Sequence, residues 1–433
     1  MGAFSLRQQL TYTCLLFVLL LLLVPRAGNE GDGNYWLAWS SYIFEHGLSN
    51  VYQLESNNYN PLYHYILWLY DTLLGSLEKV QYYFRFLKGF TLIFDFAGAF
   101  WAASLVPERE RRFGLALLLL FNIGYLYNTL IWIQVDSIYT FFAFGAVVLA
   151  ARRHPVGSVM LFVLALAAKT QAIIFLPPLV LLWVPQWWHR PWGLVRAALA
   201  GVGLAVLVLA PFIWGGWENY LPRIIAINLN AAEMYPKVSM NVYNFWYLFM
   251  PDSVLAVTLD TLPLAGLTYR QWGLLLFFAT SALALWPLFR AAVRGLRVPR
   301  TVARPAAPDM ALVLLSCGII PLLFAFFNTQ MHERYWHAAV LFLAAYGFLR
   351  RDYLPYILVS VAYFLNLESM LHYLQLLNYG TLIFQQWFIA CLFGLSIVLV
   401  LVKIYRRAPW RIGQPVAWPS TLRPVSATLE PGT

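Results

Sequence analysis

Long runs of apolar residues alternate with short polar stretches along almost the whole chain. Many of these runs have roughly 17 to 25 residues, the length of a helix that crosses the hydrocarbon core of a bilayer. The pattern therefore predicts an all-α polytopic membrane protein with about twelve transmembrane helices. The expected spans, within a few residues at each end, are 9–25, 87–107, 113–131, 137–151, 155–168, 171–184, 193–213, 272–290, 309–327, 336–349, 353–366 and 380–403.

Two longer segments separate the spans, and we expect amphipathic helices in both. In the first, 26–86, aromatic residues such as Trp36 and Tyr63 recur among polar ones at roughly helical spacing, which is typical of helices lying along a membrane surface. The second, 214–271, holds an aromatic stretch rich in asparagine. We expect one transmembrane domain over 1–410 and a disordered cytoplasmic tail over the Pro-rich residues 411–433.

Composition and charge support this topology. The chain is 61% hydrophobic and 11% charged, which excludes a soluble globular protein. The formal net charge of +10 comes from Lys and Arg that concentrate in every second loop, the bias of cytoplasmic loops, so both termini are expected inside and no nucleic-acid partner is needed. Cys14, Cys317 and Cys391 lie far apart in apolar segments and predict neither a disulfide nor a metal site.

The N-terminal apolar run has two interpretations. Arg7 precedes it and a short Arg-Ala-Gly segment follows, as in a retained first span or in a cleaved signal peptide. Both interpretations place residue 28 outside. The chain has no Asn-x-Ser/Thr sequon, which favours a bacterial inner membrane with a periplasmic site over the endoplasmic reticulum with a lumenal site.

Four consecutive residues between two apolar spans, His332, Glu333, Arg334 and Tyr335, are the first candidate site. Ionisable groups at membrane depth indicate function. The guanidinium can grip a phosphate with two parallel hydrogen bonds, the imidazole can add a donor and the carboxylate can orient both. The alternative is a loop that anchors the chain at the headgroups while Arg334 snorkels to them.

Asp32 lies on the same predicted side of the membrane, between two glycines and before an aromatic segment. A short carboxylate beside aromatic rings suits a general base next to a sugar. Glu30 competes for this role, and a solvated loop carboxylate is the alternative for either residue.

Further polar residues mark the same side. Gln134 and Asp136 precede a span, where a carboxylate is costly unless it is paired. Lys169 is followed two residues later by Gln171, and the alternative for this lysine is an interfacial anchor. Asp95 lies deeper in the second span, so we expect a structural polar contact with a residue on another span.

Several motifs together resemble the GT-C superfamily of polyprenyl-phosphate-sugar-dependent glycosyltransferases, nearest to its GPI mannosyltransferase-like branch. The resemblance covers roughly residues 25–350, and Ile133, Thr170 and Asn60 depart from the branch, which has Gly, Pro and Pro there. The similar segments are Gly31-Asp32 with Trp39 and Tyr59 to Tyr63, Lys88 to Asp95, Asn128-Thr129 with Trp132 to Ser137, Lys169 to Gln171, Tyr243 to Trp246, and Met331 to Tyr335.

The resemblance implies transfer of a hexose, mannose-like, from a polyprenyl-phosphate sugar to a hydroxyl of a glycan, glycolipid or protein acceptor, with inversion. It implies Asp32 as base, Arg334, His332 and Lys169 as the donor phosphate site, and no metal or other cofactor. Supporting polar roles then fall to Glu333, Tyr335, Gln134, Asp136, Gln171 and Asn244. The alternatives are a lipid-linked sugar flippase or other transporter, and a polysaccharide polymerase or ligase.

Overall fold

The computed structural model describes residues 4–23, 30–230, 235–299 and 307–407, and these residues are almost entirely helical. The expected tail over 411–433 and the segment after the first apolar run, 24–29, lie outside the described residues. Turns of 3₁₀ helix carry the label η. The first elements are α1 (Leu6–Leu23), α2 (Glu30–His46), η1 (Leu48–Gln53), α3 (Pro61–Leu74), α4 (Leu77–Tyr82), η2 (Phe84–Phe86), α5 (Lys88–Ser104), α6 (Arg109–Leu120), α7 (Ile123–Leu130) and α8 (Asp136–Ala151).

The rest of the chain adds further helices and one two-stranded hairpin. The middle elements are α9 (Pro155–Ala168), η3 (Thr170–Phe175), α10 (Leu176–His189), α11 (Pro191–Trp214), α12 (Leu221–Leu229), η5 (Phe245–Leu248), α13 (Asp252–Leu255), β1 (Pro263–Leu264), β2 (Leu267–Thr268) and α14 (Tyr269–Arg297). The strands pair antiparallel. The last elements are α15 (Met310–Phe327), η6 (Glu333–Trp336), α16 (His337–Arg350), α17 (Leu354–Leu371), η7 (Leu382–Phe384) and α18 (Gln386–Arg407).

Seven helices in the described part of the chain are long and apolar enough to cross a membrane. The number is eight if α6 and α7, which meet at a bend of 58°, form one span. This fits the predicted all-α polytopic membrane protein, although the expected count of about twelve is higher. Other expected spans fall on α8, α9 and α16, which have 16, 14 and 14 residues.

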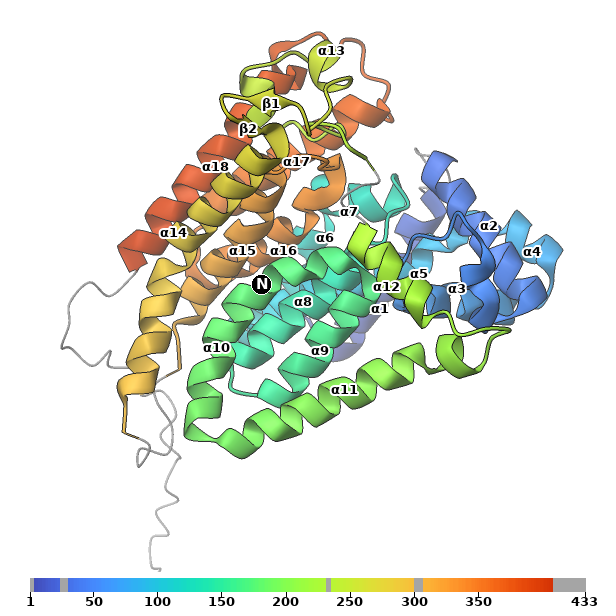
Figure 1. Cartoon of the computed structure of the whole chain (residues 1–433), viewed down its shortest axis with the longest axis horizontal. Helices are drawn as coiled ribbons and strands as arrows, with labels where there is room; N and C mark the ends of the chain where they lie inside the picture. Colours follow the sequence, from blue (N-terminus) through green and yellow to red (C-terminus); the bar gives the residue numbers. More distant parts are fainter. Residues whose placement is uncertain (1–3, 24–29, 231–234, 300–306, 408–433) are drawn as a thin grey trace, which may run out of the picture.

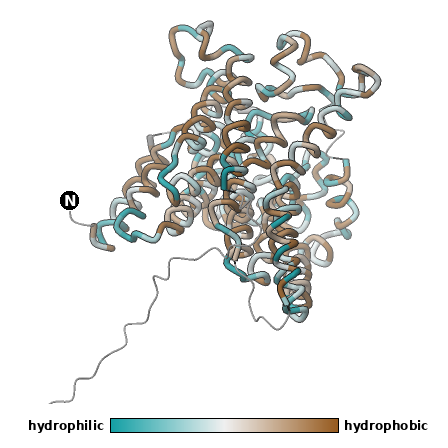
Figure 2. The backbone as a smooth tube through the Cα atoms, turned by 90° about the vertical axis from the view of Figure 1, so that its left-hand side faces the viewer, coloured by the Kyte–Doolittle hydropathy of each residue, from teal (hydrophilic) through white to brown (hydrophobic). Residues whose placement is uncertain are grey.

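The long helices pack side by side in two groups. Helices α14 to α18 form one group and α8 to α11 the other, while α2, α3 and α4 lie together beyond one end of the bundle (Figure 1). The tube in Figure 2 is hydrophobic along most of the helices and more polar where the chain turns between them. We call the end where α2 meets the start of α8, the end of α9 and η6 the site end.

Local sequence signals fix several helix ends. The Thr268 hydroxyl accepts a hydrogen bond from the backbone N–H of Gln271, and the Gln271 side-chain oxygen accepts one from the backbone N–H of Thr268. This capping box begins α14. Asp309 accepts a hydrogen bond from the first turn of α15 in the same way. Gly75 ends α3 at φ 69°, a left-handed conformation that glycine adopts without steric cost.

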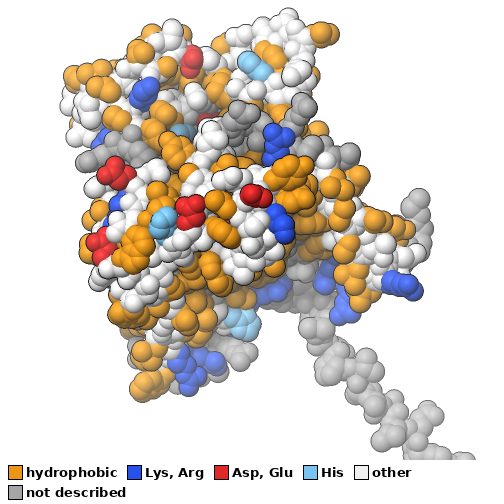
Figure 3. Space-filling model, turned by 90° about the vertical axis from the view of Figure 1, so that its right-hand side faces the viewer, with side chains coloured by type: hydrophobic (Ala, Val, Ile, Leu, Met, Phe, Trp, Pro, Cys, Tyr) orange, Lys and Arg blue, Asp and Glu red, His pale blue; other side chains and the backbone are white. Residues whose placement is uncertain are grey.

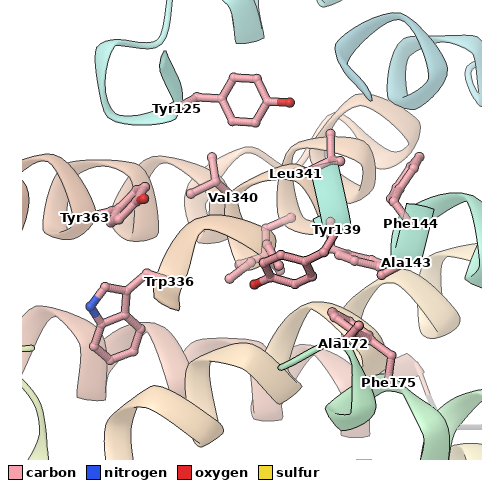
Figure 4. Close-up of a cluster of buried hydrophobic side chains, with 14 of the residues drawn as sticks. Tyr125, Tyr139, Ala143, Phe144, Ala172, Phe175, Trp336, Val340, Leu341 and Tyr363 are labelled. Carbon is pink, nitrogen blue, oxygen red and sulfur yellow. The ribbon is translucent and has the colours of Figure 1, made fainter. Parts of the chain in front are cut away.

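Helix α16 is buried along most of its length, since every residue from His337 to Phe348 is buried. Aromatic side chains from neighbouring elements surround its first turns, and Figure 4 shows Tyr139, Trp336 and Tyr363 among them. Dense packing of large side chains makes such a core nearly rigid. It therefore provides a firm support for the loops at the site end.

Candidate active site

An ion cluster at the site end joins three segments that are far apart in sequence. Asp136, at the first position of α8, is fully buried and pairs with the ammonium of Lys169, which ends α9. Arg334 of η6 lies on the other side, with its Nε 3.9 Å from Asp136 Oδ2. An acidic residue is favoured in the first turn of a helix by the helix dipole. The carboxylate is thus paired, as its cost in a membrane requires.

Asp32 comes to this cluster from α2. Its carboxylate accepts a hydrogen bond from the Gln134 side chain and lies 3.7 Å from Arg334 Nη1. Trp36, one turn later, donates to the carbonyl of Ile133 at 3.1 Å, so α2 is tied to the segment before α8 at two points. The Asp32 side chain is 27% exposed whereas that of Asp136 is inaccessible. Asp32 is therefore the carboxylate of this pair that an incoming molecule can reach.

The His332 to Tyr335 loop carries a buried glutamate and a partly buried histidine, both with shifted pKa values. Burial raises the pKa of Glu333 to about 7, against the opposing effect of Arg334, whose Nη1 is 3.3 Å from its carboxylate. Burial together with the positive charges of Arg334 and Lys169 lowers the pKa of His332 well below its usual range. The imidazole is therefore neutral near pH 7 and supplies hydrogen bonds without charge.

Aromatic rings line the cationic groups. The Lys169 ammonium lies 5.2 Å from the centre of the Tyr335 ring and 5.8 Å from that of Tyr139. Burial lowers the pKa of Lys169, and the nearby Asp136 carboxylate opposes this shift. The guanidinium carbon of Arg334 is 5.9 Å from the Tyr335 ring. These contacts favour the charged forms of both side chains in a largely dry site.

Several buried polar atoms around the cluster have no hydrogen-bond partner among the described protein groups. They are Arg334 Nε, Gln134 Oε1, Asn128 Oδ1 and Tyr139 Oη. Buried polar groups are normally paired, so a concentration of unpaired donors and acceptors in one place indicates a site for a polar ligand. The atoms include donors and acceptors, which suits a ligand with both phosphate and hydroxyl groups.

Three candidates from the sequence do not join the cluster through side-chain contacts. Asn244 donates to the carbonyls of Ala325 and Asn328 and caps η5, so it links η5 to the end of α15 and the loop that follows. Gln171 is buried, and both polar atoms of its side chain lack a partner among the described groups. The side chain of Glu30 lies outside the described residues.

Two neighbours of the cluster were absent from the predicted site. Asn128 Nδ2 lies 3.5 Å from Asp136 Oδ2. Tyr59 is partly buried, and burial is the main cause that raises its pKa, with further effects from the charges of Arg334, Asp136 and Asp32. Asn128 stands in one of the motifs that carried the family resemblance, which was the available signal. Tyr59 also stands in one of these motifs, Tyr59 to Tyr63, so the same signal was available for it.

An apolar groove lies directly behind this site. It has a volume of about 350 Å³ and is lined by residues of α9, α11 and α12, with Asn60, Thr170 and Asn228 at its polar edge. Asn60 donates to Thr170 at 3.1 Å and Asn228 donates to Asn60 at 2.9 Å, so these three side chains bond to one another. The remaining lining atoms offer an incoming molecule only apolar contacts.

Charged side chains of both signs occur on the side of the molecule where α2 to α4 lie (Figure 3). Within the described residues, no group of three His, Cys, Asp or Glu side chains is arranged to hold a metal ion.

No protein-family model matches the chain, and a search of characterised proteins finds no matching relative.

Proposed function

We propose that the protein is an integral membrane glycosyltransferase of the GT-C kind, with about twelve spans and both termini in the cytoplasm. It moves a hexose, mannose-like, from a polyprenyl-phosphate sugar to an acceptor hydroxyl on the extracytoplasmic face, with inversion. The observation that carries the proposal is the meeting of Asp32, Asp136, Lys169 and Arg334, from four separate segments, around buried polar atoms that have no partner in the described part of the chain.

In this reaction Asp32 takes the proton of the acceptor hydroxyl. The acceptor oxygen attacks the anomeric carbon from the face opposite the phosphate, and the bond from that carbon to the phosphate oxygen breaks. The electron pair of this bond stays on the leaving polyprenyl phosphate, which gains one negative charge. Base catalysis of this type contributes about a hundredfold to ten-thousandfold in rate. The accessibility of Asp32 next to buried, paired Asp136 supports this assignment.

Arg334 and Lys169 stabilise the charge that develops on the leaving phosphate, because both lie within the cluster and are fixed before the reaction. Each cation already faces a carboxylate, so an incoming phosphate competes with Asp136 and Glu333. Protonation of Glu333, whose pKa burial raises to about 7, removes one of these competitors. His332 then contributes a hydrogen bond, since its imidazole is neutral.

A lipid-linked donor also needs a place for its hydrocarbon chain. The apolar groove borders Thr170, the residue next to Lys169, and is open along α9 and α11. A polyisoprenyl chain matches a lining that offers almost only apolar contacts. We assign the groove to the part of the hydrocarbon chain nearest the donor phosphate. We place the protein in a bacterial inner membrane with the site facing the periplasm, or alternatively in the endoplasmic reticulum with a lumenal site.

A lipid-linked sugar transporter is the second candidate, because one polar group of residues around Asp95 lies deep inside the bundle. A polymerase or ligase that uses a lipid diphosphate donor is the third. Purified protein incubated with radiolabelled polyprenyl-phosphate hexoses and an extract of membrane glycolipids distinguishes them. We expect the label to move into a new glycosidic bond. Movement of intact donor across vesicles without bond formation would replace the proposal with the transporter.

A further inference from the structure

A second polar layer lies directly beneath the ion cluster, in the apolar interior of the bundle. Ser137 Oγ donates to Asp95 Oδ1 at 2.6 Å and lies 2.8 Å from Thr129 Oγ1. His337 Nε2 lies 3.3 Å from the same hydroxyl and 3.7 Å from Asp95 Oδ1. None of these side chains is more than 1% exposed.

The hydrogen bonds in this layer have a defined direction. Ser137 has one hydroxyl hydrogen and gives it to the Asp95 carboxylate, so Thr129 must be the donor in its contact with Ser137. The Ser137 oxygen therefore joins α5, α7 and α8 through a single atom. Tyr125 stacks on the His337 ring at 5.1 Å and donates to the Asp95 carbonyl, which limits movement of α16.

Three of the four members of the lower layer are close chain neighbours of a residue in or beside the cluster above, and Asp95 on α5 is the fourth. Thr129 follows Asn128, and Ser137 follows Asp136. His337 lies one turn after Arg334, at the start of α16. A shift of Ser137 by a fraction of an ångström therefore shifts Asp136 by a similar amount, since both belong to the first turn of α8. The lower layer thus sets where the charged groups above it stand.

A buried carboxylate inside a membrane span is expensive, and Asp95 Oδ2 and His337 Nδ1 have no partner among the described protein groups. Apolar residues of similar volume would give the same packing at lower cost. Buried polar groups can instead fix a single register between packed elements. The layer is therefore better explained by positioning than by stability.

We propose that Asp95 is a positioning residue that, through Ser137, holds Asp136 in register with Lys169 and Arg334. The use of this register in catalysis rests on the proposed glycosyl transfer. Asp95 does not touch the substrate and takes part in no proton transfer. Its effect is to hold the start of α8 at one height relative to the end of α9 and to η6.

The first test measures position without activity. Asp136→Cys and Lys169→Cys are combined in a chain whose three natural cysteines are replaced by alanine, and the rate of disulfide formation is measured in membranes. We expect Asp95→Leu to slow this rate at least about fivefold. Asp95→Asn should retain it, because the amide oxygen still accepts from Ser137. Asp352→Leu is the control, since Asp352 pairs with Lys403 and Tyr346 away from the cluster.

The second test measures turnover in the chain with its natural residues at 136 and 169. We expect Asp95→Leu to lower kcat about tenfold to a hundredfold with KM within about threefold, because misplacement by about 1 Å has effects of this size. Ser137→Ala should act in the same direction, and serves alone if the leucine variant does not fold. Ser396→Ala is its control, since this buried serine donates to the carbonyl of Leu392 within its own helix, α18, away from the cluster.

The outcomes separate the two proposals. Unchanged crosslinking and kcat in Asp95→Leu and Ser137→Ala would overturn the positioning role. A loss in Asp95→Asn as large as in Asp95→Leu would also overturn it, because charge rather than the bond to Ser137 would then matter. Slower crosslinking in Asp95→Leu, with no sugar transfer by the unmodified protein, would retain the positioning role and refute the proposed function.

Discussion

Two buried aspartates at the site end have very different surroundings. Asp260 accepts from Arg270 Nε at 2.9 Å and Nη2 at 3.2 Å, from Thr329 at 2.8 Å and from Gln330 at 2.7 Å. Asp136 is equally inaccessible, yet Arg334 lies 3.9 Å from it and the Arg334 Nε has no hydrogen-bond partner among the described groups. Asp136 is paired with Lys169, but its contact with Arg334 is longer than a hydrogen bond, whereas the contacts named for Asp260 are all within hydrogen-bond distance.

The difference indicates two uses of the same residue types. A fully satisfied network stabilises a fold, and here it clamps the segment before α14 to the loop after α15. A network with unmade hydrogen bonds is destabilising on its own and is retained where a ligand completes it. We therefore expect substitutions around Asp260 to change stability and those around Asp136 to change ligand binding and rate.

The largest expected effect is on the proposed base. Asp32→Asn should lower the transfer rate by about a hundredfold to ten-thousandfold, because the amide cannot take the acceptor proton. Donor binding and thermal stability should remain unchanged, since size and shape are preserved. Glu45→Gln on the same helix is the control, because Glu45 is exposed and outside the cluster. A rate within about threefold of the unmodified protein would assign the base elsewhere.

The two arginines provide the sharpest test of the comparison. Arg334→Ala should weaken binding of a non-hydrolysable polyprenyl-phosphate sugar analogue by about tenfold to a hundredfold, and Arg334→Lys by about tenfold, since lysine lacks the planar fork. Arg270→Ala should leave binding unchanged and reduce the free energy of unfolding by about 1–3 kcal/mol. Binding titration and thermal unfolding measure the two effects. Equal donor affinity in Arg334→Ala and the unmodified protein would leave Arg334 as a headgroup anchor.

Glu333 should make donor binding at the proposed site sensitive to pH. Its carboxyl faces Arg334, Asp32, Asp136 and His332, and burial raises its pKa to about 7. If the protonated form is the one that admits the donor, affinity should rise about tenfold between pH 8 and pH 6. Glu333→Gln should abolish this dependence, and titration of the analogue at several pH values is the measurement. Affinity that is constant with pH in the unmodified protein would contradict the competition between Glu333 and phosphate.

The same pKa shift has an effect on stability with a definite sign. The folded protein holds the Glu333 proton up to about pH 7, whereas the unfolded chain releases it near the ordinary glutamate pKa. The folded state therefore binds more protons across this window, and the contribution of Glu333 to stability falls as pH rises from about 4.5 through about 7. Unfolding of Glu333→Gln compared with the unmodified protein measures this contribution.

The smallest expected effect concerns the groove. Ala205→Phe places a large side chain into the lining and should raise KM for a long-chain donor about threefold to tenfold, equivalent to the loss of a few apolar contacts. Its effect on a short-chain donor should be smaller, and kcat should not change. Val206→Phe, on the exposed face of the same helix, is the matched control. Equal KM values for both variants would remove the groove from the donor site.

Hydropathy predicted the helical membrane class because a bilayer imposes a length and a polarity on each span. The sequence also indicated that Asp95 needs a partner on another span, and Ser137 on α8 is that partner. The number of long apolar helices is lower than the predicted number of spans, because some predicted spans, such as α16, are short helices. A helix that is buried inside the bundle need not have the length of a full membrane crossing. The network of Asp260 was not foreseen, because its partners lie in loops whose meeting depends on tertiary structure.

The grouping of candidate residues could be predicted from their common side of the membrane, but their pairing could not. Lys169 was expected to meet a phosphate, and in the structure it contacts Asp136. Ile133 illustrates a second limit, since it adopts φ 56°, a conformation that favours glycine. Its departure from the motif of the family that the chain resembles was visible in the sequence, but its left-handed backbone, whose carbonyl accepts a hydrogen bond from Trp36, was not.

Residues that are adjacent in the chain border the groove and the ion cluster. Tyr59 and Lys169 border the charges, and their chain neighbours Asn60 and Thr170 border the groove. Coulomb energies vary inversely with the local dielectric constant, so the medium that fills the groove influences the field on the other side. A hydrocarbon chain there would strengthen the attraction between Lys169 and a phosphate, whereas water would weaken it. The hydrocarbon chain of a bound lipid would thus increase the affinity of the site for the phosphate of the same lipid.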